Sequence, residues 1–426
     1  MILRGPRARS GAARVVALLE RGATLPSSTD ATLDPTSGTN STHNHTIGTL
    51  RVIYLDHHAA TPLCGAARRA MADAADVAWA NPASVHGAGR KARALLERAR
   101  EQVAAAIGAQ PAELVLTSGG TEACNLGVLG AGAGRARGGH LLTTAIEHPA
   151  VAKALARRAA ERDAELSALA VPDGIAPDPA ALRAALRPDT RLVALQWINH
   201  ETGSVLRVAE YAAVCREANV PLFIDATQAL GKLPCDVRAL GADLVAFAAH
   251  KLGGPSGAGA LWLRRGHALE PLLEGGAQEH GLRAGTPDVL SAVGFGAACA
   301  ALDERLGEQA RLRALQARAD AELRALGAAL NGAGGTRVGT VSNASFAGVR
   351  GDELVAALDL EGVQVSSGAA CSSGLSAPSP VLRAMYPEQP WRAESALRLS
   401  FGPETTEIQL ESALAALAKV LPRVRR

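Results

Sequence analysis

The sequence predicts an α/β protein with a large domain built on a mainly parallel sheet and a smaller α+β domain. The chain has 426 residues, enough to bury two cores. From Val52 onward, short apolar runs alternate with alanine-rich helical stretches, which is typical of βαβ units. Residues 289–326 form a long stretch charged on one side, which suits a helix that connects two domains. Further apolar runs follow this stretch.

These runs define the expected elements. In the large domain, residues 52–305, we expect helices at 92–107 and 150–162. Its predicted strands are 114–117, 141–144, 192–197, 222–224, 244–247 and 259–263. The smaller domain, residues 306–426, has predicted strands at 340–346, 364–366 and 396–401. Residues 52–65 are a candidate to pack on this smaller domain.

The first 51 residues differ from the rest. Arginines at the start of the chain are followed by a run rich in Ser, Thr and Asn at 27–46, a composition that indicates a disordered N-terminal extension. Two origins stay open. The extension is either an organellar targeting segment or a dispensable addition from an upstream start codon.

Composition excludes several classes of function. A net charge of +3 and an aromatic content of 3% argue against nucleic-acid binding. No apolar run approaches the length of a membrane span. Six cysteines, with no CxxC pair, indicate neither a zinc site nor a disulfide framework. Free thiols fit a reducing compartment, so we expect a cytoplasmic protein unless the extension directs it to an organelle.

Three predicted strand ends carry chemically useful residues. Residues 117–123 form a Gly-rich turn before a helix and could hold a phosphate, although such turns also occur for steric reasons alone. Asp225 ends an apolar strand and could hold a ring nitrogen protonated, or could cap a helix. Lys251 leaves an apolar strand, where partial burial lowers the pKa of an amine toward that of a Schiff-base nucleophile; a solvated lysine is the alternative. Together they favour pyridoxal phosphate as cofactor.

The chain from Tyr54 to its end resembles the class V aminotransferase family, and within it the cysteine desulfurases of the NifS and IscS kind. The resemblance implies the fold type I of pyridoxal-phosphate-dependent transferases. The matching motifs are 54–62, 117–125, 147–148, 199–203, 225–228, 250–251, 278–286, 366–373 and 398–402.

The resemblance also implies roles for cofactor-binding residues. Lys251 is expected to form the Schiff base with pyridoxal 5'-phosphate, Asp225 to pair with its ring nitrogen and Gln228 to bond its phenolic oxygen. His148 is expected to stack on the ring and to transfer protons. Asn199 is expected near the phenolic oxygen and the substrate carboxylate. The expected phosphate ligands are Gly120, Thr121 and His250. Thr286 is expected to reach the phosphate bound in a partner subunit. This last contact requires a homodimer.

Two further residues are expected to act on the substrate, L-cysteine. Arg398 would bind its carboxylate through the planar guanidinium fork. Cys371 would take its sulfur as a persulfide and leave L-alanine. Its Ser/Gly/Ala-rich surroundings indicate a mobile loop rather than the buried site usual for a structural cysteine. A sulfur-acceptor protein, either an iron–sulfur scaffold or a thiolation protein, would then receive the sulfur.

Two departures from the family pattern leave questions open. The family often has a hydroxyl at the position of Ala248, so cofactor affinity could be reduced. The chain also extends only a short way past Arg398, which leaves the acceptor undefined. The alternative functions are a selenocysteine lyase, another class V aminotransferase or lyase, and, from a different class, a non-catalytic sulfur-relay or scaffold partner.

Overall fold

The computed structural model describes residues 46–47, 50–132, 137–368 and 377–426. Most of the predicted extension, residues 1–51, therefore lies outside the described residues. Its last part contains two short strands, β1 (Thr46–Ile47) and β2 (Leu50–Arg51), which pair antiparallel.

A seven-stranded sheet forms the centre of the large domain, in the order β4-β10-β9-β8-β7-β5-β6. Its strands are β4 (Leu114–Thr117), β5 (His140–Thr144), β6 (Glu165–Leu169), β7 (Thr190–Gln196), β8 (Leu222–Asp225), β9 (Leu244–Ala248) and β10 (Gly259–Leu263). Neighbours from β9 through β8, β7 and β5 to β6 are parallel. Only β10 runs antiparallel to its neighbours β4 and β9, so the predicted mainly parallel sheet is confirmed.

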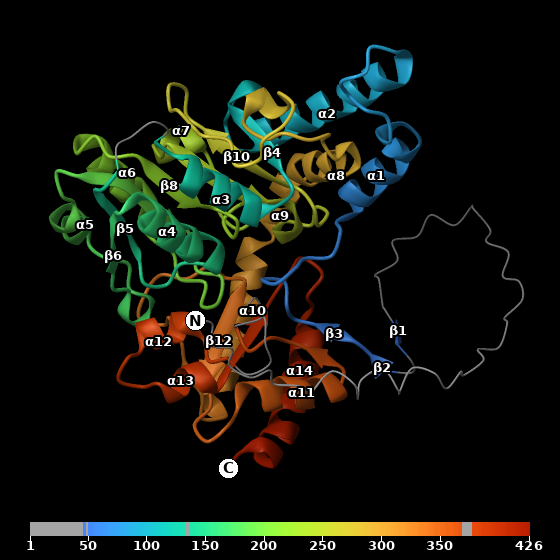
Figure 1. Ribbon diagram of the computed structural model, residues 1–426. Helices are drawn as coiled ribbons and strands as arrows, with labels where there is room; N and C mark the ends of the chain where they lie inside the picture. Colours follow the sequence, from blue (N-terminus) through green and yellow to red (C-terminus); the bar gives the residue numbers. More distant parts are fainter. Residues whose placement is uncertain (1–45, 48–49, 133–136, 369–376) are drawn as a thin grey trace, which may run out of the picture. The chain divides into compact units, whose positions relative to one another are not determined.

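Helices cover both faces of this sheet, which explains why its central strands are apolar without interruption. On one face lie α3 (Gly120–Gly130) and α4 (Pro149–Arg162), which pack on a core that includes Phe223 (Figure 1). The residues on either side of Phe223, Leu222 and Ile224, face the other core. That core is covered by α1 (Gly65–Ala78), α2 (Gly87–Ala106), α6 (Val208–Glu217), α7 (Val237–Leu240) and α8 (Val289–Ala300). A short helix, α5 (Pro179–Ala185), packs beside α6.

The predicted connecting helix at 289–326 is wrong as a single element. The chain forms α8, then α9 (Leu302–Gly307) and α10 (Gln309–Ala325), with breaks at Ala301 and Glu308. The packing partners change across these breaks, because α8 packs on α1 and α2, whereas α10 packs on the smaller domain. The role as connector is retained, and Figure 1 shows α9 and α10 running from one domain to the other.

The smaller domain is built on an antiparallel sheet of β11 (Ala329–Leu330), β12 (Val341–Ser345) and β14 (Ala396–Ser400). Its core also takes in side chains of α10, α11 (Gly351–Leu360) and α14 (Glu407–Val424). Two short helices, α12 (Pro380–Met385) and α13 (Trp391–Glu394), precede β14.

The start of the matching region belongs to this smaller domain. Strand β3 (Ile53–Tyr54) pairs in parallel with β13 (Val363–Gln364), and Asp56 forms a bridge to Ser400 at the end of β14. Residues 57–60 then cross toward the large sheet, where Thr61 N bonds to the carbonyl of His250. Within the described part of the chain, no helix combines the length and apolar character needed to cross a membrane.

Candidate active site

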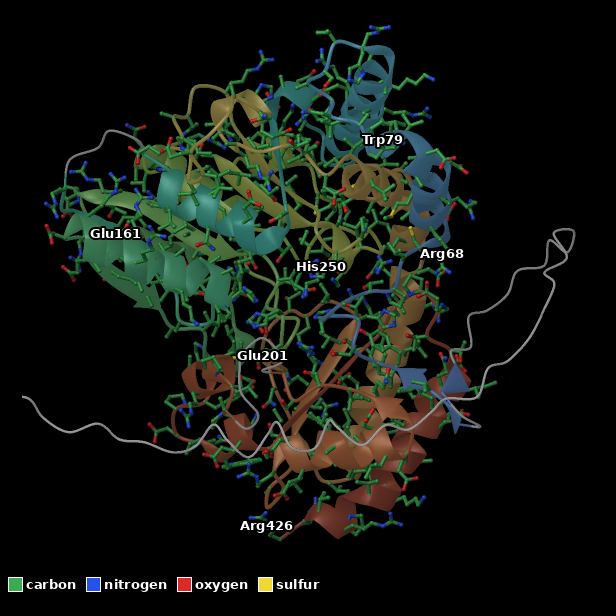
Figure 2. The ribbon with its side chains drawn as sticks, turned by 45° about the vertical axis from the view of Figure 1, so that its right-hand side comes forward. Arg68, Trp79, Glu161, Glu201, His250 and Arg426 are labelled. Carbon is green, nitrogen blue, oxygen red and sulfur yellow. The ribbon has the colours of Figure 1, made fainter. Side chains whose placement is uncertain are left out.

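One cavity of about 150 Å³ lies at the carboxyl ends of β8 and β9. Residues of the smaller domain complete its lining. This is where open α/β sheets bind ligands. Figure 2 shows His250, one of its lining residues, in the region between the two domains. The predicted site residues that line it are Gly120, Thr121, His148, Asp225, Gln228, His250, Lys251 and Arg398.

Lys251 follows β9 in a short turn and points its amine across the cavity. Its Nζ donates hydrogen bonds to the carbonyl oxygens of His58, at 2.6 Å, and Ala59, at 3.0 Å. Both carbonyls belong to the crossing segment 57–60. The amine is therefore held at the cavity wall by neutral acceptors.

Asp225 ends β8 and is 4% exposed. Its Oδ1 accepts a hydrogen bond from Thr227 N at 3.0 Å. Burial and this carboxylate together raise the pKa of the neighbouring Cys124 thiol well above its ordinary value. A buried carboxylate at the wall of this cavity is complementary to a protonated ring nitrogen.

The amino end of α3 lies at one end of the cavity and has the features of an anion site. Its N-cap residue, Gly119, provides no side chain, so no side chain caps the first backbone N–H groups of the helix. Gly120 is required by close packing, because a Cβ there would lie 2.7 Å from Cγ2 of Thr227 and 3.0 Å from Cβ of Ala248. Thr121 and His250 complete this end.

Thr227 is a lining residue that the sequence interpretation missed. It lies beside Ala248. Ala248 stands at the position where the family resemblance leads us to expect a hydroxyl. The sequence did contain a signal for Thr227, because a residue with a hydroxyl side chain stands two positions after Asp225, which ends the strand. Only the pairing of β8 with β9 shows that these two strand ends meet at one point.

His148 caps the amino end of α4, with its Nδ1 accepting from Ala150 N at 3.1 Å. In the neutral ring, Nε2 therefore carries the proton and remains available to the cavity. The ring makes an edge contact with His200, at 4.9 Å between centroids. Burial lowers the pKa of His148, with Lys251 adding to this effect and the Asp225 carboxylate opposing it.

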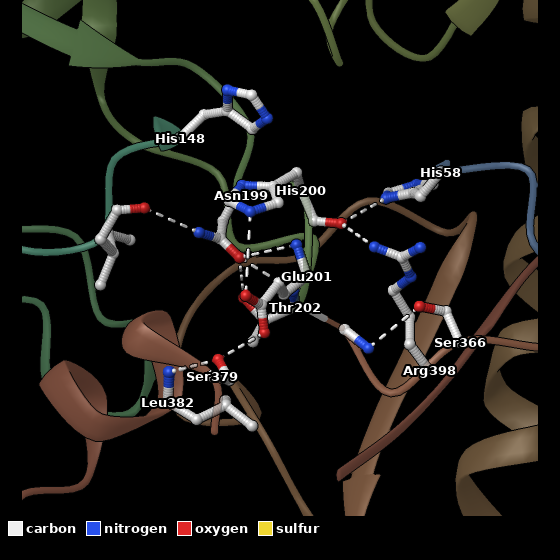
Figure 3. A network of polar contacts seen from close by, with 12 residues as sticks. His58, His148, Asn199, His200, Glu201, Thr202, Ser366, Ser379, Leu382 and Arg398 are labelled. Carbon is white, nitrogen blue, oxygen red and sulfur yellow. Dashed lines mark hydrogen bonds and ion pairs between the residues drawn. The ribbon is translucent and has the colours of Figure 1, made fainter. Parts of the chain in front are cut away.

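Arg398 enters the cavity from β14 and is almost fully buried. Its Nη1 donates to the carbonyl of His200 at 3.1 Å, and its Nη2 donates to Asp56 at 2.6 Å (Figure 3 shows the first contact). Its Nε has no partner among the described residues. Asp56 is a second residue that the sequence interpretation missed, because its partner is remote in the chain.

Asn199 is the predicted residue that the structure does not bring into the cavity lining. Its Nδ2 donates to the carbonyl of Ile146, and its Oδ1 accepts from the backbone of Glu201 and Thr202 (Figure 3). The amide is thus used to hold the turn at 199–203. This turn places His200 in the lining and buries Glu201, which accepts from Ser379 at 2.6 Å.

A second predicted residue, Thr286, is also not among those that line this cavity. Thr286 lines a separate cavity of about 300 Å³ together with Ser118 and Arg283. Cys371 lies outside the described residues, as does the expectation of a mobile loop around it. The described residue nearest before it, Gly368, lines the first cavity. Among the side chains that the structure describes, no cluster of His, Cys, Asp and Glu is suited to hold a metal ion.

The cavity fits pyridoxal phosphate on these observations. An amine on Lys251, a buried carboxylate on Asp225 and an uncapped helix terminus at Gly120 match its aldehyde, ring nitrogen and phosphate.

Comparisons with known proteins agree with this interpretation. The class V aminotransferase model matches residues 53–412. An IscS-like cysteine desulfurase of Mycobacterium tuberculosis is 40% identical over 383 residues, which are 88% of this chain and 97% of that protein. The cysteine desulfurase IscS of Anaeromyxobacter dehalogenans is 41% identical over 88% of this chain and 93% of its own length.

Solved structures show the same fold. A NifS-like protein superposes with a TM-score of 0.80 at 28% identity, covering 87% of this chain and all of that one. The predicted fold is therefore confirmed at the level of the whole described chain. From the extent of these matches, this chain belongs to the class V aminotransferase family and, within it, to the cysteine desulfurases of the IscS and NifS kind.

Proposed function

We propose that this chain uses pyridoxal 5'-phosphate to transfer the sulfur of L-cysteine to Cys371 and releases L-alanine. The observation that carries the proposal is the placement of Lys251 and Asp225 at neighbouring strand ends, facing one cavity. When bound, the cofactor supplies an electron sink that makes the substrate Cα–H acidic. The protein residues bind, orient and move protons around it.

Each lining residue has a proposed task. Lys251 would hold the cofactor through its side-chain amine. Asp225, a buried carboxylate at the cavity wall, keeps the ring nitrogen protonated. His148 presents Nε2–H to the cavity and exchanges protons there. Arg398 attracts the substrate carboxylate with its guanidinium group, part of which is already fixed by Asp56.

Cys371 is the proposed nucleophile. Its thiolate sulfur forms an S–S bond with the substrate sulfur while the substrate Cβ–S bond breaks, and the electron pair of that bond stays on Cβ, which takes up a proton. The products are a cysteine persulfide on the enzyme and alanine. Atoms and electrons balance without an external oxidant. The other five cysteines are a poor choice, because four are buried and none of the five stands in the 366–373 motif.

The active species is proposed to be a homodimer. Thr286 lies outside the first cavity, so it can act on a phosphate only in the site of a partner subunit. The sulfur is proposed to pass to an acceptor protein, either an iron–sulfur scaffold or a thiolation protein. The cytoplasm is the proposed location, with the alternative that residues 1–51 direct the chain to an organelle.

The test is to mix the holoenzyme with L-cysteine and an excess of a dithiol reductant, which is oxidised to its disulfide as it reduces the persulfide and releases the outer sulfur as sulfide, and to measure alanine, sulfide and keto acid. Equal amounts of alanine and sulfide, with no need for a keto acid, are expected. Lys251→Ala should abolish both products and the borohydride-reducible cofactor linkage. A requirement for a keto acid would instead indicate an aminotransferase, and turnover of selenocysteine alone would indicate a lyase for that substrate. A wild-type protein that takes up no pyridoxal phosphate would point to a relay or scaffold role.

A further inference from the structure

Lys232 is a buried lysine directly behind the cavity wall. It follows the turn after β8 and is 5% exposed. Its Nζ donates a hydrogen bond of 2.8 Å to Oε1 of Gln228, which lines the cavity. Lysine is rarely buried to this extent without a counter-charge. Its position therefore needs an explanation beyond packing.

The amide of Gln228 is held from both ends. While Oε1 accepts from Lys232, Nε2 donates to the carbonyl of His58 at 2.9 Å. A peptide carbonyl only accepts, so the contact with His58 requires Nε2 of the amide to face it and leaves Oε1 to accept from Lys232. Turning the amide over would place Oε1 against the carbonyl oxygen of His58. The donor end of Gln228 is thus fixed toward His58.

This donor end lies next to the reactive amine. The same carbonyl of His58 accepts from Nζ of Lys251 at 2.6 Å. The two donors therefore converge on one oxygen at the cavity wall. In the proposed function the amine of Lys251 is bound to the cofactor as a Schiff base. Nε2 of Gln228 is then a hydrogen-bond donor at the cavity wall, next to the carbonyl of His58.

The charges around Lys232 show that it is not part of an ordinary ion pair. Burial, Arg305 and Lys251 lower the pKa of Lys232 well below its ordinary value. Among the residues that the structure describes, no carboxylate forms an ion pair with it. The small cavity on its other side is lined by His57, Arg305 and other residues without a carboxylate. The amide oxygen of Gln228 is consequently its hydrogen-bond acceptor.

We infer that Lys232 is a positioning residue that orients Gln228, so that the amide N–H is presented to the phenolic oxygen of the cofactor. The inference rests on the proposed function. A donor at this oxygen stabilises its anionic form and so lowers the affinity of the Schiff base for its proton. Lys232 acts through Gln228 and is not itself one of the residues that line the cavity.

The test is a pH titration of the absorbance of the Schiff base in the holoenzyme without substrate. Lys232→Met removes the donor and should move the midpoint up by about one pH unit, the equivalent of one hydrogen bond. Lys232→Gln retains an N–H donor and should titrate close to the wild type. Lys153→Met, at an exposed position on α4, is the matched control and should leave the midpoint unchanged.

A double-mutant cycle separates orientation from a general effect of the charge. Gln228→Leu alone should shift the midpoint as Lys232→Met does, and adding Lys232→Met to it should produce no further shift. An unchanged midpoint in Lys232→Met, or a shift that persists in full in the Gln228→Leu background, would overturn the inference. If Lys232→Met does not fold, a shift of Lys232→Gln as large as that of Gln228→Leu would overturn it. In each case alanine and sulfide release by the wild type still stands as the separate test of the proposed function.

Discussion

The carboxylate of Asp56 and the guanidinium of Arg398 lie 2.6 Å apart, although 342 positions separate them in the chain. The pair forms because β3 joins the smaller domain, where Asp56 bridges to Ser400 beside the strand that carries Arg398. The side chain of Arg398 is 3% exposed and that of Asp56 is 18% exposed. A single acid thus compensates a buried charge at the edge of the cavity.

Removing this acid should damage both stability and substrate binding. Asp56→Ala leaves the Arg398 charge buried without its ion pair, which we expect to lower the free energy of unfolding by about 3 kcal/mol. It should also raise KM for L-cysteine more than it lowers kcat. Asp56→Asn keeps an acceptor oxygen and should lose less. Urea unfolding and steady-state kinetics check this, with Asp73→Ala on the exposed side of α1 as control. Equal stability of the Asp56→Ala and Asp73→Ala variants would contradict the role of the pair.

The hydroxyl of Thr227 should contribute to cofactor affinity in place of a hydroxyl at Ala248. Thr227→Ala is expected to weaken binding of pyridoxal phosphate by about fivefold, since one hydrogen bond contributes roughly 1 kcal/mol. Thr227→Ser keeps the hydroxyl and should bind nearly as the wild type does. Titration of the apo protein with cofactor, followed by absorbance, measures both. The interpretation fails if the Ala and Ser variants bind equally well.

The buried carboxyl of Glu147 should make stability depend on pH. Burial, with a contribution from Asp225, raises its pKa from 4.5 to about 8. Between these two values the unfolded chain loses the proton while the folded protein keeps it. The contribution to stability is therefore fully present below about pH 4.5, is lost as the pH rises toward 8, and then stays constant.

Glu147→Gln mimics the protonated carboxyl and removes this dependence. Near pH 5 the variant and the wild type should have similar free energies of unfolding. Near pH 9 the variant should be more stable, by an amount on the order of a few kcal/mol. Urea unfolding at several pH values is the measurement, with Glu101→Gln on the exposed face of α2 as control. Parallel curves for the wild type and Glu147→Gln would show that the carboxyl is ionised in the folded protein.

Strand-end residues could be predicted from the sequence because their signal is local. Asp225 and Lys251 each follow an apolar run, and parallel strands bring such ends to one edge of the sheet. Residues that depend on contacts between distant segments could not be predicted in this way. Asp56 needs β14 beside it, and Lys232 needs the neighbouring Gln228 to be fixed by the crossing segment at His58.

Two departures from the sequence predictions have physical reasons of the same kind. The stretch 289–326 has continuous helical periodicity, but its two ends pack on different domains and the helix breaks between them. Asn199 has the polarity of a binding residue, yet its amide is used by the turn that positions His200 and Glu201. Periodicity and polarity do not show which partner a side chain will find.

The choice of Cys371 as nucleophile separates desulfuration from the other chemistry that this cofactor supports. Cys371→Ser keeps the size of the side chain, but a hydroxyl is far less nucleophilic than a thiolate at neutral pH and cannot hold sulfur as a persulfide. Cofactor uptake and the spectral response to L-cysteine should persist, because they depend on Lys251 and Arg398. Alanine and sulfide release should fall by at least a hundredfold.

Cys64→Ser, at the partly exposed N-cap of α1, is the control and should retain activity. Mass spectrometry of the wild type after one turnover should find the added sulfur on the peptide that contains Cys371. Sulfur on any other cysteine, or wild-type turnover by Cys371→Ser, would show that a different thiol performs the transfer.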